Sequence, residues 1–144
     1  MLEAVRTRGA RSLREALQLL RILHFAIWEA GNYHNTLGRF DQYMYPYYEQ
    51  SRKEGMTREF AQELTDCVWL KLNDINKCRD AASSEGFAGY SLFQNLIVGG
   101  QTVEGEDATN DLSFMAITAT EHVFLPQPSF SVRVWNGSPH EFLI

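Results

Sequence analysis

The stretch that decides the fold is residues 93–135, which read FQNLIVGGQTVEGEDATNDLSFMAITATEHVFLPQPSFSVRVW. The short apolar run at 93–98, followed by two glycines, predicts a strand. Residues 108–124 predict a helix that Asp107 caps and that two prolines end. Residues 129–135 alternate along the chain as a second strand does. Strand, helix and strand together predict a βαβ unit, whose two strands run parallel with a right-handed crossover.

Helical patterns dominate the residues before this unit. Ser12 and Glu15 form an S-x-x-E capping box that opens a helix over 12–30. Residues 31–39 are expected to form a polar loop. Further helices are expected at 2–8, 40–53 and 57–76, the second of them interrupted by Pro46. The predicted fold class is therefore α/β, a mostly helical segment plus a βαβ unit.

Composition excludes several classes of protein. Of the 144 residues, 44% are hydrophobic and 22% are charged, which is typical of a globular domain. The chain has no stretch of about 18 apolar residues, and its start lacks the apolar core of a signal peptide. The net charge of −5 argues against nucleic acid as the main partner. We therefore expect a cytoplasmic protein that binds neither nucleic acid nor membrane.

The last residues bear on whether the sequence is a whole domain. Ser138 and Glu141 form a second S-x-x-E box, so a helix is predicted to begin just before Ile144. A helix of barely one turn is unstable in isolation, and Phe142 would have no packing partner. We therefore expect an internal piece of a longer protein.

Histidines and cysteines are the first candidates for chemistry. No histidine has the spacing of a zinc-binding helix. His24, on the apolar stripe of the helix over 12–30, is expected to be a core histidine with its hydrogen bonds satisfied. Cys67 is expected to be buried and inert, while two basic neighbours of Cys78 favour a thiolate. His34 stands among polar loop residues, which makes it the histidine best suited to contact a ligand.

Five segments occur in a characteristic order along the chain. They are LGRFDQYMYPY at residues 37–47, TREFAQELTDCVWLKL at 57–72, QNLIVGG at 94–100, GEDATNDLS at 105–113 and QPSFSVRV at 127–134. This ordered set resembles the glycyl radical enzymes, a family that is pyruvate formate-lyase-like. The most similar branch holds diol dehydratases, choline lyase and hydroxyproline dehydratase. Residues 1–144 are thus identified as a partial pyruvate formate-lyase-type domain.

The resemblance implies an α/β barrel made of two half-barrels, to which the βαβ unit would contribute. In this family a backbone glycyl radical takes hydrogen from a cysteine, and the resulting thiyl radical abstracts hydrogen from the substrate. Elimination, or cleavage of a C–O, C–N or C–C bond, follows. The implied partners are a small polar organic substrate, an S-adenosylmethionine iron–sulfur activating enzyme that installs the radical, and a second copy in a homodimer.

The two motifs that carry this chemistry do not occur in residues 1–144. The family's cysteine lies in G-C-x-E, but Cys67 and Cys78 have other neighbours. Its radical glycine lies in R-V-x-G-Y, whereas residues 133–136 read RVWN. We therefore expect no catalytic residue, no bound metal or cofactor, and no activity of these residues alone.

Four residues are expected to line the substrate pocket of the parent enzyme. In the diol dehydratase branch a His-Ser pair precedes the first motif and contacts substrate, and Tyr33 and His34 occupy those positions here. This departure argues against glycerol or propanediol as the substrate. The family presents an aromatic side chain just before the strand at 93–98. Tyr90 matches that region, with Phe87 as the alternative.

Two other interpretations of the sequence remain open. The chain could be a freestanding non-catalytic α/β interaction module or a decayed paralogue, which predicts cooperative folding in isolation. It could also be a small metal hydrolase that uses His34 and a carboxylate such as Asp41.

Overall fold

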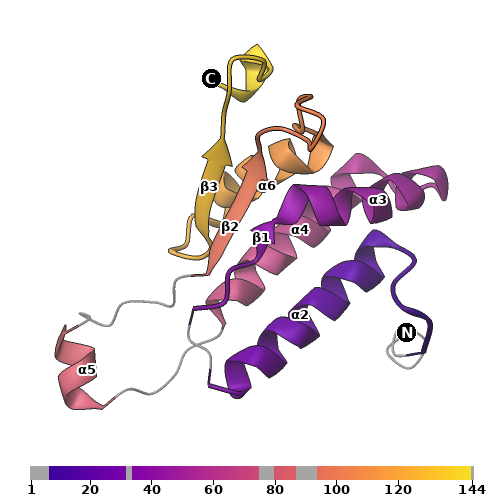
Figure 1. Ribbon diagram of the computed structural model, residues 1–144. Helices are drawn as coiled ribbons and strands as arrows, with labels where there is room; N and C mark the ends of the chain where they lie inside the picture. Colours follow the sequence, from indigo (N-terminus) through magenta and orange to yellow (C-terminus); the bar gives the residue numbers. More distant parts are fainter. Residues whose placement is uncertain (1–6, 32–33, 75–79, 87–93, 144) are drawn as a thin grey trace.

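The computed structural model describes residues 7–31, 34–74, 80–86 and 94–143, and a three-stranded parallel sheet lies at its centre (Figure 1). The strands are β1 (Gly38–Arg39), β2 (Asn95–Gly99) and β3 (Ser129–Arg133), in the order β1-β2-β3. Strands β2 and β3 pair in parallel, and a helix lies between them in the sequence. This arrangement confirms the predicted βαβ unit.

Strand β1 lies within the predicted polar loop, so that prediction is wrong at its end. The Leu37 N–H donates a hydrogen bond to the Asn95 carbonyl at 2.7 Å, and Gly38 and Arg39 then pair with β2. Two residues are too few to show the alternation by which a strand is detected in a sequence. The short strand therefore forms through its pairing with β2 rather than through a local preference.

Helices cover one face of the sheet. They are α3 (Phe40–Lys53), α4 (Arg58–Asn73) and α6 (Asp111–Val123), while α2 (Leu13–Glu29) packs on α3 and α4. All four helices have bounds close to the predicted ones. In Figure 1, α4 and α6 lie behind the sheet, while the short α5 (Ala81–Gly86) lies apart from it. Helix α3 continues through Pro46, which removes one N–H donor, so the predicted interruption is wrong. Of the predicted helix at 2–8, only residues 7 and 8 are described, and both are helical.

Aromatic side chains tie the sheet to the helices. Phe40 and Trp69 are buried, and their ring centroids lie 5.6 Å apart in an edge-to-face arrangement. Trp69 also meets Phe130 of β3 at 6.3 Å. Burial of a large apolar side chain stabilises the fold by about 1.5–3 kcal/mol. This cluster, together with the buried Leu96 of β2, holds the strands against α3 and α4.

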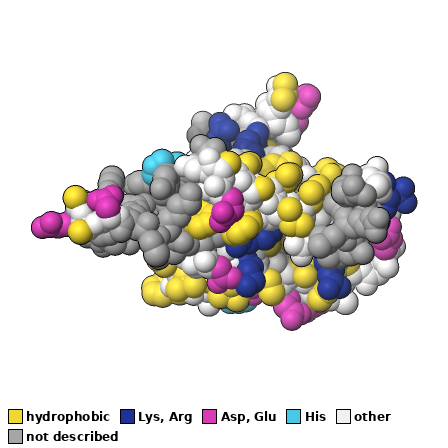
Figure 2. Space-filling view, turned by 90° about the horizontal axis from the view of Figure 1, so that it is seen from below, with side chains coloured by type: hydrophobic (Ala, Val, Ile, Leu, Met, Phe, Trp, Pro, Cys, Tyr) yellow, Lys and Arg dark blue, Asp and Glu magenta, His cyan; other side chains and the backbone are white. Residues whose placement is uncertain are grey.

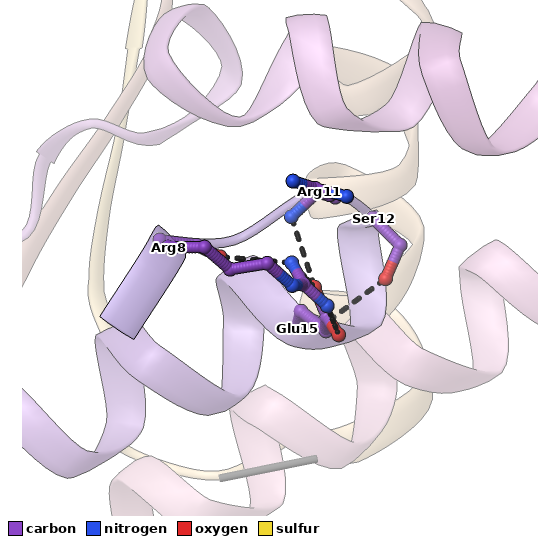
Figure 3. Close-up of polar contacts among 5 residues, drawn as sticks. Arg8, Arg11, Ser12 and Glu15 are labelled. Atoms are coloured by element: carbon purple, nitrogen blue, oxygen red, sulfur yellow. Dashed lines mark hydrogen bonds and ion pairs between the residues drawn. The ribbon is translucent and has the colours of Figure 1, made fainter. Parts of the chain in front are cut away.

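The predicted capping box at the start of α2 forms with one change of partner (Figure 3). The Ser12 hydroxyl accepts a hydrogen bond from the Glu15 N–H at 3.2 Å, as expected. The Glu15 carboxylate accepts from the Arg11 N–H at 3.0 Å and pairs with the Arg8 guanidinium at 2.8 Å. Arg8 and then Arg11 lower the pKa of Glu15, because their donors favour its charged form.

Helix α6 begins three residues later than predicted. Its N-cap is Asn110, whose side chain accepts from the N–H groups of Leu112 and Ser113, while the Ser113 hydroxyl accepts from the Asn110 N–H. Asp107 instead accepts a hydrogen bond from Trp135 Nε1 at 3.0 Å. Asp and Asn are equally good caps, so the sequence alone does not separate the two positions.

The buried face of α4 is rotated from the predicted one. Phe60 is 40% exposed, and Cys67 is exposed as well, so the expectation that Cys67 is buried is wrong. The residues that α4 buries are Ala61, Thr65, Val68, Trp69 and Leu72. Trp69 accounts for the rotation, because its Nε1 donates to the Thr120 hydroxyl of α6 at 2.9 Å. Cys78 lies outside the described residues.

The end of the chain packs better than its sequence predicts. Phe142 lies in a short 3₁₀ helix, η1 (His140–Phe142), is buried, and meets Phe114 edge-on at 5.5 Å. The expectation that Phe142 has no packing partner is therefore wrong. Ser138 does not cap a helix either, since its hydroxyl accepts from the Trp135 N–H at 3.1 Å.

None of the helices in the described ranges combines the length and the apolar character needed to span a bilayer. The predicted cytoplasmic location stays a prediction.

His24 is buried as predicted, but its hydrogen bonds are not satisfied. Neither ring nitrogen has a hydrogen-bond partner among the described residues. Burial lowers the pKa of His24 below its ordinary 6.5, and the positive charge of Arg21 lowers it further. The ring is therefore neutral in the folded chain at pH values where the unfolded chain already takes up a proton.

This burial makes stability depend on pH. Because the unfolded state binds the proton more readily, the free energy of unfolding is expected to fall as the pH drops below about 6.5. His24→Leu should flatten that dependence and raise the free energy of unfolding at neutral pH by about 1 kcal/mol. Urea unfolding followed by circular dichroism between about pH 7 and about pH 5 measures both effects. His140→Leu, at an exposed histidine, is the control, and an equal flattening there would contradict the account.

Candidate functional site

A buried carboxylate joins three elements at the carboxyl-terminal edge of the sheet. Asp41, in the first turn of α3, is fully buried. Its Oδ2 accepts hydrogen bonds from the Gly99 N–H and from the Ser113 hydroxyl, both at 2.6 Å. Its Oδ1 has no hydrogen-bond partner among the described residues. One oxygen therefore fixes the end of β2 against the starts of α3 and α6.

Further contacts hold Gly99 in place. The Arg39 Nη2 donates to the Gly99 carbonyl at 2.9 Å, and Asn110 Nδ2 donates to the Asp41 carbonyl at 3.3 Å. Gly99 adopts a φ of +73°, and a Cβ added there would lie 2.6 Å from the Phe142 ring and 2.8 Å from the Arg133 carbonyl. This backbone conformation and the lack of space both require glycine. The corner around Gly99 is thus fixed by the Arg39 side chain of β1, by Asp41 of α3 and by close contact with the backbone of β3.

The other face of the sheet carries mainly polar side chains and no described helix. Leu96 and Val98 of β2 are buried against the helices, so the alternate residues of the strand point the other way. The pairing of the strands places six side chains on this open face: Arg39, Asn95, Ile97, Ser129, Ser131 and Arg133. In Figure 1 no described helix lies in front of the sheet. Because parallel sheets are normally covered on both faces, the open face is suited to line an internal chamber.

The structure describes one of the four predicted pocket residues. His34 is exposed and lies three residues before Leu37, whose N–H binds the first residue of β2. It therefore lies towards the amino-terminal edge of the sheet. Tyr33, Phe87 and Tyr90 lie outside the described residues, so the structure does not bring the four together. Their contact with a substrate stays a prediction.

His34 and Asp41 lie towards opposite edges of the sheet. Asp41 is engaged with Gly99 at the carboxyl-terminal edge. In the part of the chain that the structure describes, no group of three or more His, Cys, Asp and Glu side chains is arranged to hold a metal ion. The interpretation as a metal hydrolase therefore finds no site among those residues.

A tyrosine supports the turn into β1. The Tyr43 hydroxyl donates to the Leu37 carbonyl at 2.8 Å. Burial raises the pKa of Tyr43, and the Asp41 carboxylate raises it further. The phenol therefore keeps its proton and remains a hydrogen-bond donor at neutral pH.

The Asp41 network was not predicted from the sequence. Asp41 is separated from Gly99 by 58 residues and from Ser113 by 72. Local patterns show only that Asp41 begins a helix, where a carboxylate is favoured in any case. No short-range signal identifies its two distant donors.

Comparisons with known proteins place this geometry in context. The model of a family described as pyruvate formate lyase-like matches residues 1–144. The solved structure concerned with 1,2-propanediol dehydration in Roseburia inulinivorans is 66% identical, with a TM-score of 0.86 over 93% of this chain. The glycerol-bound B12-independent glycerol dehydratase from Clostridium butyricum is 57% identical, with a TM-score of 0.87 over 94% of this chain. A glycyl radical enzyme from Archaeoglobus fulgidus is 33% identical, with a TM-score of 0.85 over 94%.

The chain spans a small share of each of these proteins. It covers 17% of the first two solved chains and 18% of the third. It likewise spans 13 to 17% of the length of the first curated relatives that it matches, which are a dehydratase and sulfite-lyases. These findings confirm the resemblance and the α/β fold predicted from the sequence.

Proposed function

Because the chain belongs to the pyruvate formate lyase-like family, we propose that it forms one wall of the substrate chamber of a glycyl radical dehydratase that acts on a small vicinal diol. The observation that carries the proposal is the 66% identity, over 93% of the chain, to the Roseburia inulinivorans protein described for 1,2-propanediol dehydration. The glycerol dehydratase at 57% identity favours the same substrate class. Glycerol and 1,2-propanediol both carry hydroxyl groups on neighbouring carbons, so the reaction is loss of water through C–O cleavage.

Positions 33 and 34 affect the choice among such diols. Tyr33 and His34 stand where the diol dehydratase branch has a His-Ser pair, a departure that counts against glycerol and propanediol themselves. His34 still offers an imidazole that can donate or accept a hydrogen bond from a hydroxyl. The identity over more than nine-tenths of this chain outweighs this local change for the class of substrate. The presence of Tyr33 and His34 in place of the His-Ser pair would instead determine which diol is preferred.

The residues of this chain would position the substrate rather than react with it. The open face of the sheet supplies a polar wall, and the Asp41 network holds that wall at one edge. A rigid wall around the substrate excludes water, which would otherwise intercept a reactive intermediate. The glycyl radical would supply hydrogen abstraction from elsewhere in the enzyme. The activating enzyme that uses S-adenosylmethionine and an iron–sulfur cluster, and assembly as a homodimer, belong to this proposal as well.

A chimera tests the proposal. The matching segment of the Clostridium butyricum glycerol dehydratase is replaced by residues 1–144, and the chimera is activated without oxygen. Electron paramagnetic resonance measures the glycyl radical, and aldehyde formation from glycerol, 1,2-propanediol and longer vicinal diols measures turnover. We expect at least one diol to be converted, with kcat/KM within about a hundredfold of the parent, because pocket contacts of this kind change selectivity by 10–200-fold.

His34 provides the matched variant for that experiment. His34→Ala should lower kcat/KM for the preferred diol by about tenfold or more, the loss expected for one hydrogen bond to a substrate. His140→Ala, at an exposed histidine near the end of the chain, should leave kcat/KM unchanged. A folded chimera that carries the radical signal but converts no diol would contradict the proposal.

A further inference from the structure

We propose that the groove between α2 and α4 binds a small amphipathic carboxylate. The groove has a volume of about 300 Å³. Leu17, Leu64 and Val68 form its apolar wall, and Arg14, Arg21 and Lys71 supply positive charge. Both sides therefore match a molecule that carries a carboxylate on a short apolar tail.

The charges of the groove are unusual for this chain. The net charge of the sequence is −5, yet the groove is lined by three basic residues and no acidic one. Lys71 is paired with the exposed Asp74, and the negative charge of Asp74 also acts on Arg21. The Nη1 of Arg21 is buried and has no hydrogen-bond partner among the described residues. That nitrogen is too buried to touch a ligand, so the attraction for an anion comes from the combined positive charge of Arg14, Arg21 and Lys71.

The apolar side of the groove favours a ligand with a tail over a simple inorganic anion. Leu17 and Val68 are buried at its base. The guanidinium of Arg21 lies 5.8 Å from the centroid of the Phe25 ring, which is 46% exposed and extends the apolar surface along α2. Figure 2, seen from below, shows Lys and Arg side chains among hydrophobic ones and a few acidic ones in the middle of the face. The volume is at the lower limit of small-molecule pockets. It suits a carboxylate of roughly six to eight carbons better than a helix of a partner protein.

Cys67 lines the same groove and is exposed, so it serves as a built-in reporter. Iodoacetate and iodoacetamide both alkylate its thiolate, with loss of iodide, but only iodoacetate is an anion. Both rates depend equally on the fraction of Cys67 that is thiolate, so this fraction drops out of their ratio. The ratio of the iodoacetate rate to the iodoacetamide rate therefore measures the attraction of the groove for a carboxylate. The rates are measured by mass spectrometry of the peptide that contains Cys67, on the chain and in parallel on the chimera.

The variants separate the groove from the general charge of the chain. Arg21→Gln should lower the iodoacetate-to-iodoacetamide ratio at least about threefold, because clustered charges concentrate a counter-ion locally. Arg14→Gln, at an exposed arginine, gives a second test should Arg21→Gln fail to fold. Lys53→Gln, at the exposed end of α3, removes one charge outside the groove and should leave the ratio unchanged.

Competition by small acids and amides then tests whether the groove requires both the carboxylate and the apolar tail. Hexanoate at about 2 mM should slow alkylation of Cys67 by iodoacetamide about threefold, as expected for a dissociation constant of about 1 mM. Hexanamide, which lacks the charge, and acetate, which lacks the tail, should protect much less. The proposal is overturned if the three compounds protect equally, if none protects, or if the Arg21→Gln and Arg14→Gln ratios equal that of Lys53→Gln. Protection only by an acidic helical peptide would also overturn it, in favour of a protein partner. Turnover of the chimera does not enter these readouts, so the two proposals fail independently.

Discussion

Replacing Asp41 by alanine is expected to lower the free energy of unfolding by about 3 kcal/mol, the sum of two hydrogen bonds to a charged acceptor. The substitution leaves the Gly99 N–H and the Ser113 hydroxyl buried without their acceptor. Asp41→Asn keeps an oxygen in the same place without the charge, so its cost should be about half as large. Urea unfolding, followed by circular dichroism, measures both variants.

The control for Asp41 is a carboxylate with a different environment. Asp74 is exposed and pairs with Lys71 at the end of α4. Asp74→Ala should cost about 0.5 kcal/mol or less, because exposed ion pairs contribute little to stability. Equal losses at Asp41 and Asp74 would mean that the buried network does not stabilise the fold.

Gly99→Ala is expected to destabilise the chain by about 3 kcal/mol or more, because a disfavoured left-handed backbone conformation and a steric clash act together. The added methyl group would lie 2.8 Å from the Arg133 carbonyl, which is backbone and cannot turn aside. It would also push the Phe142 ring out of its buried place. Loss of thermal stability and greater exposure of Phe142 to solvent are the measurable results.

A variant at Gly105 separates the cost of the backbone conformation from the cost of the steric clash. Gly105 has a φ of +86°, but a Cβ added there would meet nothing within 4 Å. Gly105→Ala should therefore cost only the backbone term, about 1–2 kcal/mol. The difference between the two alanine variants measures the clash at Gly99. If the two variants lose the same stability, the close packing around Gly99 is not as the structure has it.

The elements that the sequence predicts well are those with a strong local signal. The helix of α3 has the predicted bounds, and the start of α2 follows from the Ser12 and Glu15 box. Strand β2 is recognisable because its apolar run ends at two glycines. In each case the determining residues lie within a few positions of one another. Local propensity and periodicity are then sufficient.

The errors arise where distant residues decide the outcome. Strand β1 exists because Leu37 reaches the Asn95 carbonyl, and the face of α4 is set by the contact of Trp69 with Thr120. Phe142 packs against Phe114 across the end of the sheet rather than within its own helix. The Asp41 network belongs to the same class, since its partners are far away in the sequence. Of the candidate pocket, the sequence names His34 through its polar loop neighbours and then through resemblance, and the structure shows it exposed near one edge of the sheet.

We propose that the open face of the sheet turns towards the interior of a larger radical enzyme. Ser131 lies on that face and is exposed in this chain. With Ser131→Cys, the thiol at position 131 should react readily with iodoacetamide in the isolated chain. In the chimera, the same thiol should react at least about tenfold more slowly until the protein is unfolded, because buried sites react only through opening. Mass spectrometry of the peptide that contains residue 131 gives both rates. Equal rates in the folded chimera and in the isolated chain would contradict the account.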